Sequence, residues 1–259
     1  MTQRLPASAG SADRGGASGG VAAAASPLLA VIGAGGLAVL ASAGPAAGAV
    51  GAASSLVVPL IAAWSVIRRR RQAVTSADRV TLLRVALIGI LTSALVLAIA
   101  GDLPSRTWIV LGLASAAALL DAVDGWAARR AGRGTDAGAR LDAESDAAAL
   151  LVLSTLLAMT VGWWVLLMGL MRYVFAAGSL LRPHWSRALP YSSFRRAVAA
   201  LQAMAVVIGL APIVPVPAAA ALSGAALAAL LVSFGRDALL LERMRHGSDS
   251  RHPDGADAS

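Results

Sequence analysis

Four aspartates stand in two closely spaced pairs near the middle of the chain. Asp121 and Asp124 are three residues apart, and Asp142 and Asp146 are four residues apart. Either spacing places both carboxylates of a pair on one face of a helix. Two antiparallel helices joined by the intervening segment would bring all four carboxylates together. Like charges about 4 Å apart repel by several kcal/mol in a partly buried site, so this cluster favours divalent cations.

The composition narrows the kind of metal site. The chain has no cysteine, and its three histidines are scattered at His184, His246 and His252. Carboxylates are therefore the expected ligands, and their oxygens suit hard ions such as Mg²⁺, Ca²⁺ or Mn²⁺. Two such ions would balance four aspartates and still attract a diphosphate. A helix cap would explain one of the aspartates but not all four at these spacings.

A lipid bilayer is the predicted solvent for most of the chain. Hydrophobic residues make up 58% of the sequence and charged residues 14%, whereas soluble domains carry about 25% charged residues. Residues 21–67 and 197–235 contain no charged residue, and each run is long enough for two spans of about 20 residues. Breaks divide the apolar runs at Gly44–Gly48, Gly101–Pro104, Val161–Trp164 and Ala211–Pro217. We therefore expect an all-α, polytopic membrane protein with eight spans.

The arginines orient these spans. All 22 basic residues are arginines, and the net charge is +8. If Arg68–Arg71 lie in the cytoplasm, sixteen arginines fall in cytoplasmic loops and flanks, and only Arg106 lies in an outer loop. This asymmetry is typical of the positive-inside rule and explains the basic charge without nucleic acid. The aspartates are then expected at the cytoplasmic face of a bacterial-type inner (plasma) membrane.

The two aspartate pairs belong to a longer pattern. From Asp121 to Asp146 it reads D-x-x-D-G-x-x-A-R, then eight residues, then G-x-x-x-D-x-x-x-D. This pattern resembles the signature of the CDP-alcohol phosphatidyltransferase family at every fixed position. The resemblance extends over about residues 77–236, which corresponds to the six-span membrane core of that family. The two N-terminal spans lie outside it.

Four segments are expected on this basis. Residues 1–20 would form a disordered tail, 21–71 two extra transmembrane helices and a basic stop, 72–236 the family-like membrane domain, and 237–259 a charged tail. A cleaved signal sequence is the alternative for the first apolar stretch, because the small residues Ala41–Ala43 resemble a cleavage site.

The resemblance implies roles for individual residues. In the family the four aspartates bind two divalent ions, usually Mg²⁺ with Mn²⁺ as the alternative, and the last aspartate is also the general base. Asp121, Asp124, Asp142 and Asp146 would be the metal ligands here, and Asp146 the catalytic residue. The CDP moiety would be contacted by Asp78, Thr81, Gly125, Arg129, Thr135 and Gly138. The segment Ala77–Thr81 is similar to the family's P-N/D-x-x-T element, with alanine in place of proline. An ordinary loop threonine is the alternative for Thr135.

Three arginines are candidates for binding the acceptor. Arg172 lies inside an apolar run, where a charged side chain costs about 2.5–3.5 kcal/mol. Family members that use phosphorylated acceptors are similar in carrying an arginine in this span. Pairing with an aspartate or snorkelling towards the cytoplasm are the alternatives for Arg172. Arg140 and Arg195 are the other candidates, although a positive-inside flank also explains Arg195.

The resemblance thus implies a metal-dependent transferase of phospholipid biosynthesis. It would move a phosphatidyl or similar phospho-alcohol group from a CDP-alcohol, with CDP-diacylglycerol as the expected lipid donor, to a small or phosphorylated alcohol and release CMP. Arg140 and Glu144 depart from the forms of the well-known glycerophosphate, inositol-phosphate and serine enzymes, so the acceptor stays open. The alternatives are a non-catalytic scaffold or transporter of the same fold, and a CDP-choline-type head-group transferase. Homodimers are common in that family.

Overall fold

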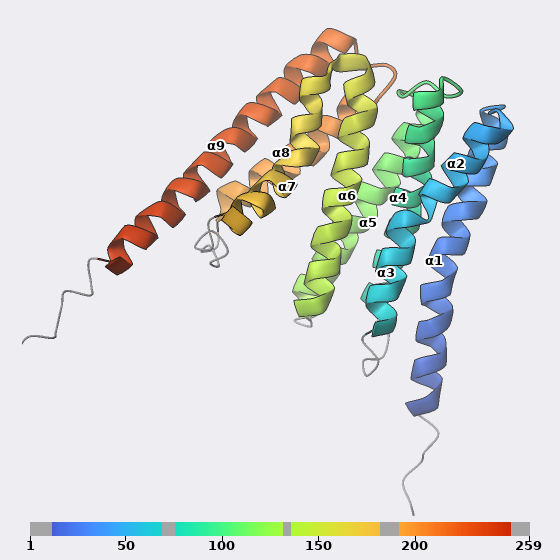
Figure 1. Ribbon diagram of the computed structural model, residues 1–259, viewed down its shortest axis with the longest axis horizontal. Helices are drawn as coiled ribbons and strands as arrows, with labels where there is room; N and C mark the ends of the chain where they lie inside the picture. Colours follow the sequence, from blue (N-terminus) through green and yellow to red (C-terminus); the bar gives the residue numbers. More distant parts are fainter. Residues whose placement is uncertain (1–11, 69–75, 132–135, 182–191, 250–259) are drawn as a thin grey trace, which may run out of the picture.

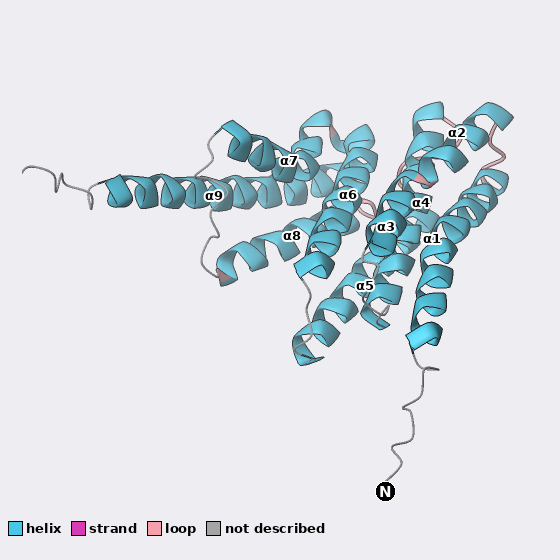
Figure 2. Cartoon of the chain, turned by 60° about the horizontal axis from the view of Figure 1, so that its bottom comes forward, coloured by secondary structure: helices cyan, strands magenta, loops and turns pink. Residues whose placement is uncertain are grey.

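The computed structural model describes residues 12–68, 76–131, 136–181 and 192–249. These parts of the chain form helices, one short 3₁₀ turn and no strand (Figures 1 and 2). The elements are α1 (Ala12–Leu40), α2 (Pro45–Ser55), α3 (Val57–Arg68), α4 (Ser76–Ala100), α5 (Trp108–Ala131), α6 (Asp136–Val161), η1 (Trp163–Val165), α7 (Leu166–Leu181), α8 (Ser193–Gly209) and α9 (Val216–Asp249).

Several of the described helices are apolar enough to cross a membrane. Four helical stretches meet the length and hydropathy expected of a span: Pro45–Trp64, Val80–Ala100, Asp142–Val161 and Val216–Leu241. Shorter apolar helices cover Ala25–Leu40, Trp108–Val123 and Trp163–Gly178, whereas α8 falls in neither group. Large apolar side chains are exposed on the outer faces, as expected where lipid is the solvent. The predicted all-α, polytopic membrane fold is confirmed, and the count of eight spans stays a prediction.

The chain reverses where the sequence predicts it. The α4 helix ends at Gly101, which has a φ of +85°, a left-handed conformation that favours glycine. The N–H of Asp102 donates to the carbonyl of Leu97 at 2.9 Å and so closes the end of the helix. A second glycine, Gly162 with a φ of +141°, separates α6 from η1. These turns make α5 antiparallel to α4 and α7 antiparallel to α6 (Figure 1).

Two helices are longer than the sequence indicates. The α1 helix already begins at Ala12, and α9 continues to Asp249, so part of each predicted tail is helical. Once a helix is nucleated, each added residue gains a hydrogen bond. Residues 237–249 also include three leucines and two arginines, which are good helix formers.

The α4 helix lies at the centre of one half of the bundle, because α1, α2, α3, α5 and α6 all pack against it. Its Leu91 and Leu97 are fully buried in the main core, together with Leu156 and Leu157 of α6. The N-terminal helices α1, α2 and α3, which we call the N-terminal hairpin, are therefore packed on α4.

The loops at the upper end of the bundle in Figure 1 are held to one another. Arg106 donates to the carbonyl of Ala211 at 2.6 Å and also to that of Val214, which joins the α4–α5 loop to the α8–α9 loop. The carboxylate of Asp102 accepts a hydrogen bond from the N–H of Gly44 at 3.3 Å. The opposite end holds the beginnings of α4 and α6 and the end of α5, and we call it the aspartate end.

Candidate metal centre

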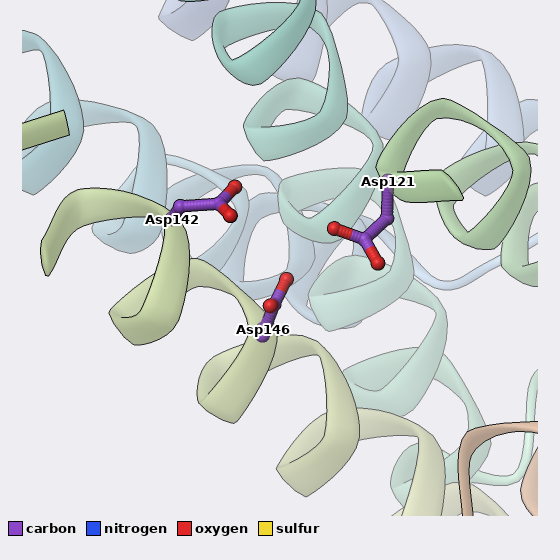
Figure 3. Close-up of side chains that lie close together, drawn as sticks. All are labelled: Asp121, Asp142 and Asp146. Atoms are coloured by element: carbon purple, nitrogen blue, oxygen red, sulfur yellow. The ribbon is translucent and has the colours of Figure 1, made fainter. Parts of the chain in front are cut away.

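Three aspartates meet at the aspartate end. Asp121 comes from α5, and Asp142 and Asp146 come from successive turns of α6. Each offers a carboxylate oxygen, and these atoms all lie within 4.8 Å of one another. Figure 3 shows the three side chains pointing towards a common space between the helices. The side chains are 48%, 41% and 50% exposed, in that order, so the cluster is open to solvent at the helix ends.

This donor set fits a hard divalent cation. Carboxylate oxygens are the ligands that Mg²⁺ and Mn²⁺ prefer, and the described residues of the cluster offer no nitrogen or sulfur ligand. Asp124 lies one turn after Asp121 on the backbone of α5. Its side chain is outside the described residues, so a fourth ligand from Asp124 stays a prediction.

A buried arginine lies against the carboxylates. The guanidinium of Arg84, on α4, forms ion pairs with Asp121 and Asp142 and lies 3.3 Å from Asp146. It also donates to the hydroxyl of Ser145 at 2.7 Å. The Arg84 side chain is only 3% exposed, whereas the three carboxylates are about half exposed. One cation on α4 therefore joins the two helices that carry the aspartates.

Sequence reasoning missed Arg84. The signal that would have found it is that Arg84 is the single charged residue in the apolar run 80–100. A charged side chain in a membrane span is costly and indicates a functional site with a charged partner. It also follows Thr81 by three residues, so the two share a face of α4. Thr81 is itself buried.

For the other residues predicted to contact CDP, the structure describes only the position of the backbone. Asp78 lies in the first turn of α4, Gly125 and Arg129 lie in the last turns of α5, and Gly138 lies in the first turn of α6. Thr135 is outside the described residues. The helix ends that carry the signature are thus adjacent to the aspartates, while their contacts with a nucleotide stay predictions.

Arg172 has a different partner from those that the sequence suggests. It lies on α7, and its guanidinium donates to the carboxylate of Glu144, on α6, at 2.8 Å. Both side chains are exposed, Arg172 by 46% and Glu144 by 65%. Within the described residues, Arg172 makes no ion pair with an aspartate. Glu144 lies between Asp142 and Asp146 in the sequence, so this pair borders the cluster. The side chain of Arg140 is outside the described residues.

Arg195 lies in a polar pocket between α8 and α9. Its guanidinium pairs with Asp237 at 2.9 Å, and Asp237 is 14% exposed. Arg236 stacks over the ring of Phe194 with 5.0 Å between the guanidinium carbon and the ring centroid. The cavity has a volume of about 200 Å³ and is lined by Ser192, Phe194, Arg195, Ser233, Arg236, Asp237 and Leu240. Two arginines against one aspartate leave this pocket with a net positive charge.

Comparison with known proteins identifies a family whose sequence profile matches this chain. The sequence profile described as CDP-alcohol phosphatidyltransferase matches residues 74–234, which is more than half of the chain. The match includes Arg84 and the three clustered aspartates, and it leaves out the N-terminal hairpin. No curated protein and no solved structure matches the chain.

Proposed function

We propose, from the premise that the chain belongs to the CDP-alcohol phosphatidyltransferase family, that it transfers a phosphatidyl group from CDP-diacylglycerol to an alcohol and releases CMP. The family consists of CDP-alcohol phosphotransferases. The observation that carries the proposal is the convergence of Asp121, Asp142 and Asp146, whose carboxylate oxygens lie within 4.8 Å of one another. Such a set of carboxylates would hold the divalent ions on which the family depends.

The metal ligands in this proposal are the four aspartates of the signature: Asp121, Asp124, Asp142 and Asp146. When bound, two Mg²⁺ or Mn²⁺ ions would neutralise charge on the diphosphate of the donor. The chain itself supplies hard oxygen donors on two helices, α5 and α6, that both pack against α4. These carboxylates are about half exposed, so an ion and a diphosphate can reach them from the solvent.

Asp146 is the proposed general base. Its carboxylate takes the proton of the acceptor hydroxyl as the hydroxyl oxygen bonds to the β-phosphorus of the donor. The bond from this phosphorus to the CMP oxygen breaks, and CMP leaves with the electron pair. Two features support this role: Asp146 is half exposed, and its contact with Arg84 is an ion pair at 3.3 Å without a hydrogen bond.

The lipid part of the donor needs an apolar path to the site. Leu119 and Val123 of α5 stand two residues before and after Asp121, and they are 66% and 56% exposed. Because two residues turn a helix by about 200°, these side chains leave α5 on the side away from Asp121, where they would contact a diacylglycerol moiety that remains in the bilayer. The nucleotide would be held by Asp78, Thr81, Gly125, Arg129, Thr135 and Gly138.

The acceptor is proposed to bind on the side of α7, α8 and α9. Arg172, which pairs with Glu144 of α6, and the pocket of Arg195 at the start of α8 supply positive charge there. This charge favours an acceptor that carries a phosphate. Arg140 is the third proposed contact. The arginine distribution supports a cytoplasmic orientation of this end.

A single substitution tests the chemistry. Asp146→Asn keeps the shape of the side chain but removes its basicity, so CMP release should fall by at least about 10²-fold. Asp102→Asn is the matched control, because it makes the same chemical change at the opposite end of the bundle. The assay uses purified protein, Mg²⁺, CDP-diacylglycerol and a panel of neutral and phosphorylated alcohols. Equal CMP release from Asp146→Asn and the unsubstituted chain would refute the base assignment.

The same assay separates the alternatives. A scaffold or transporter of the same fold would release no CMP with any alcohol in the panel. A CDP-choline-type transferase would instead release CMP from CDP-choline with diacylglycerol as the acceptor.

A further inference from the structure

The free-energy cost of burying the charge of Arg84 must be offset by its surroundings. It is the single charged residue in the apolar run 80–100, and its side chain is 3% exposed. An arginine inside a membrane span is energetically costly and needs charged or polar partners. The described partners that offset this cost are three carboxylates and the hydroxyl of Ser145.

The guanidinium contacts one oxygen of each carboxylate. In Asp121, Asp142 and Asp146 the atom that pairs with Arg84 is Oδ1. The hydrogen bonds of the guanidinium to Asp121 and Asp142 are both accepted by Oδ1. The rigid fork of a guanidinium suits this task, because several donors in one plane can fix several oxygens. The guanidinium thus fixes the carboxylates while their side chains stay 41–50% exposed, so an ion can still reach them.

Charge repulsion opposes the arrangement in the absence of a cation. Carboxylates whose oxygens lie within 4.8 Å of one another repel each other. Asp121 and Asp142 lie on different helices, so their repulsion would tend to separate the ends of α5 and α6. The α4 helix packs against both helices, and its Arg84 pairs with a carboxylate from each of them.

We propose that Arg84 is a positioning residue that holds the metal-binding carboxylates in place before any ion binds. The proposal rests on the proposed metal site. For the metal affinity of a variant without Arg84, it predicts the opposite of what a simple counter-charge would give. If Arg84 only neutralised the cluster, its removal would leave a more negative site and tighten metal binding. If it positions the carboxylates, its removal weakens metal binding, as the loss of groups that orient metal ligands does.

The test measures Mn²⁺ affinity by isothermal titration on the purified full-length protein, without donor or acceptor. Arg84→Gln, which loses the charge and the fork, should bind Mn²⁺ about 10- to 100-fold more weakly than the unsubstituted chain. Arg84→Lys keeps the charge but not the fork, and its affinity should lie between the two. Thermal unfolding without metal should show that Arg84→Gln is also less stable.

The matched control is Arg106→Gln, which removes an arginine that holds backbone carbonyls at the opposite end of the bundle. It should lose stability and keep its Mn²⁺ affinity. Unchanged or tighter Mn²⁺ binding by Arg84→Gln would overturn the proposal. If that variant does not fold, wild-type affinity in Arg84→Lys would overturn it. Because no substrate is present, an inactive protein that still binds Mn²⁺ would refute the transferase proposal and leave this test intact.

Discussion

Gly89 of α4 lies directly against the backbone carbonyl of Ser55, the last residue of α2. A Cβ atom on residue 89 would overlap that oxygen, and it would also lie 3.0 Å from the Cβ of Ala30 on α1. Gly51 of α2 makes a similar approach, where an added Cβ would lie 2.7 Å from the hydroxyl of Ser93. Small residues thus let the N-terminal hairpin pack closely on α4, as they do between membrane helices in general.

The first prediction concerns this packing. Gly89→Val should lower the thermal unfolding midpoint in detergent, with a loss of about 1–3 kcal/mol, because the side chain must displace backbone. Gly112→Val is the control, since Gly112 of α5 is exposed and an added Cβ would meet nothing within 4 Å. Equal midpoints for the two variants would show that the hairpin does not depend on this contact.

The second prediction concerns metal binding. Mn²⁺ or Mg²⁺ should raise the unfolding midpoint of the unsubstituted chain, since an ion that binds only the folded state stabilises it by about 2.7 kcal/mol at 100 times its dissociation constant. Asp142→Asn should reduce this gain, because it removes one ligand charge, and Asp102→Asn should not. The measurement is a series of melting curves at increasing metal concentration. An equal gain in both variants would refute the assignment of Asp142 as a ligand.

The third prediction uses the pair of Glu144 and Arg172. Glu144→Gln should lower the KM of a phosphorylated acceptor, because Arg172 no longer shares its charge with a carboxylate. Both side chains are exposed, and such pairs contribute only about 0.2–1 kcal/mol, so the change should stay within about fivefold.

Arg172→Gln should act in the opposite direction and raise the same KM. The control is a neutral acceptor, whose KM should be the same in both variants. If neither substitution changes the KM of the phosphorylated acceptor, Arg172 does not contact it.

The fourth prediction separates two roles of Arg195. Arg195→Gln leaves the carboxylate of Asp237, which is 14% exposed, without its 2.9 Å partner, and should cost about 1–3 kcal/mol of stability. Adding Asp237→Asn should recover most of the lost stability, because no unpaired charge remains. Chemical denaturation of the single and double variants gives the coupling energy.

The acceptor KM then shows whether Arg195 also binds substrate. If it does, the double variant should be stable and still have a raised KM for a phosphorylated acceptor. A double variant with the KM of the unsubstituted chain would leave Arg195 with a structural role alone.

Local features of the sequence determined much of this protein. Apolar runs and their breaks predicted the helices and their reversals, because the length of a span and the conformations open to glycine are local properties. The spacing of Asp142 and Asp146 placed both on one face of α6, because 3.6 residues make one helical turn. The signature pattern by itself also indicated the family. Helix ends were less certain: α1 begins inside a predicted tail, since elongation of a helix needs little sequence information.

The tertiary structure decided which charges meet. Arg84 and Asp142 are 58 residues apart in sequence, and Arg172 pairs with Glu144 rather than with an aspartate. Such pairings depend on the angle and depth at which separate helices pack, and that packing is set by many contacts at once, including the small residues between α4 and the N-terminal hairpin. A sequence shows that a charge in an apolar span needs a partner, but only the packed helices show which partner is within reach.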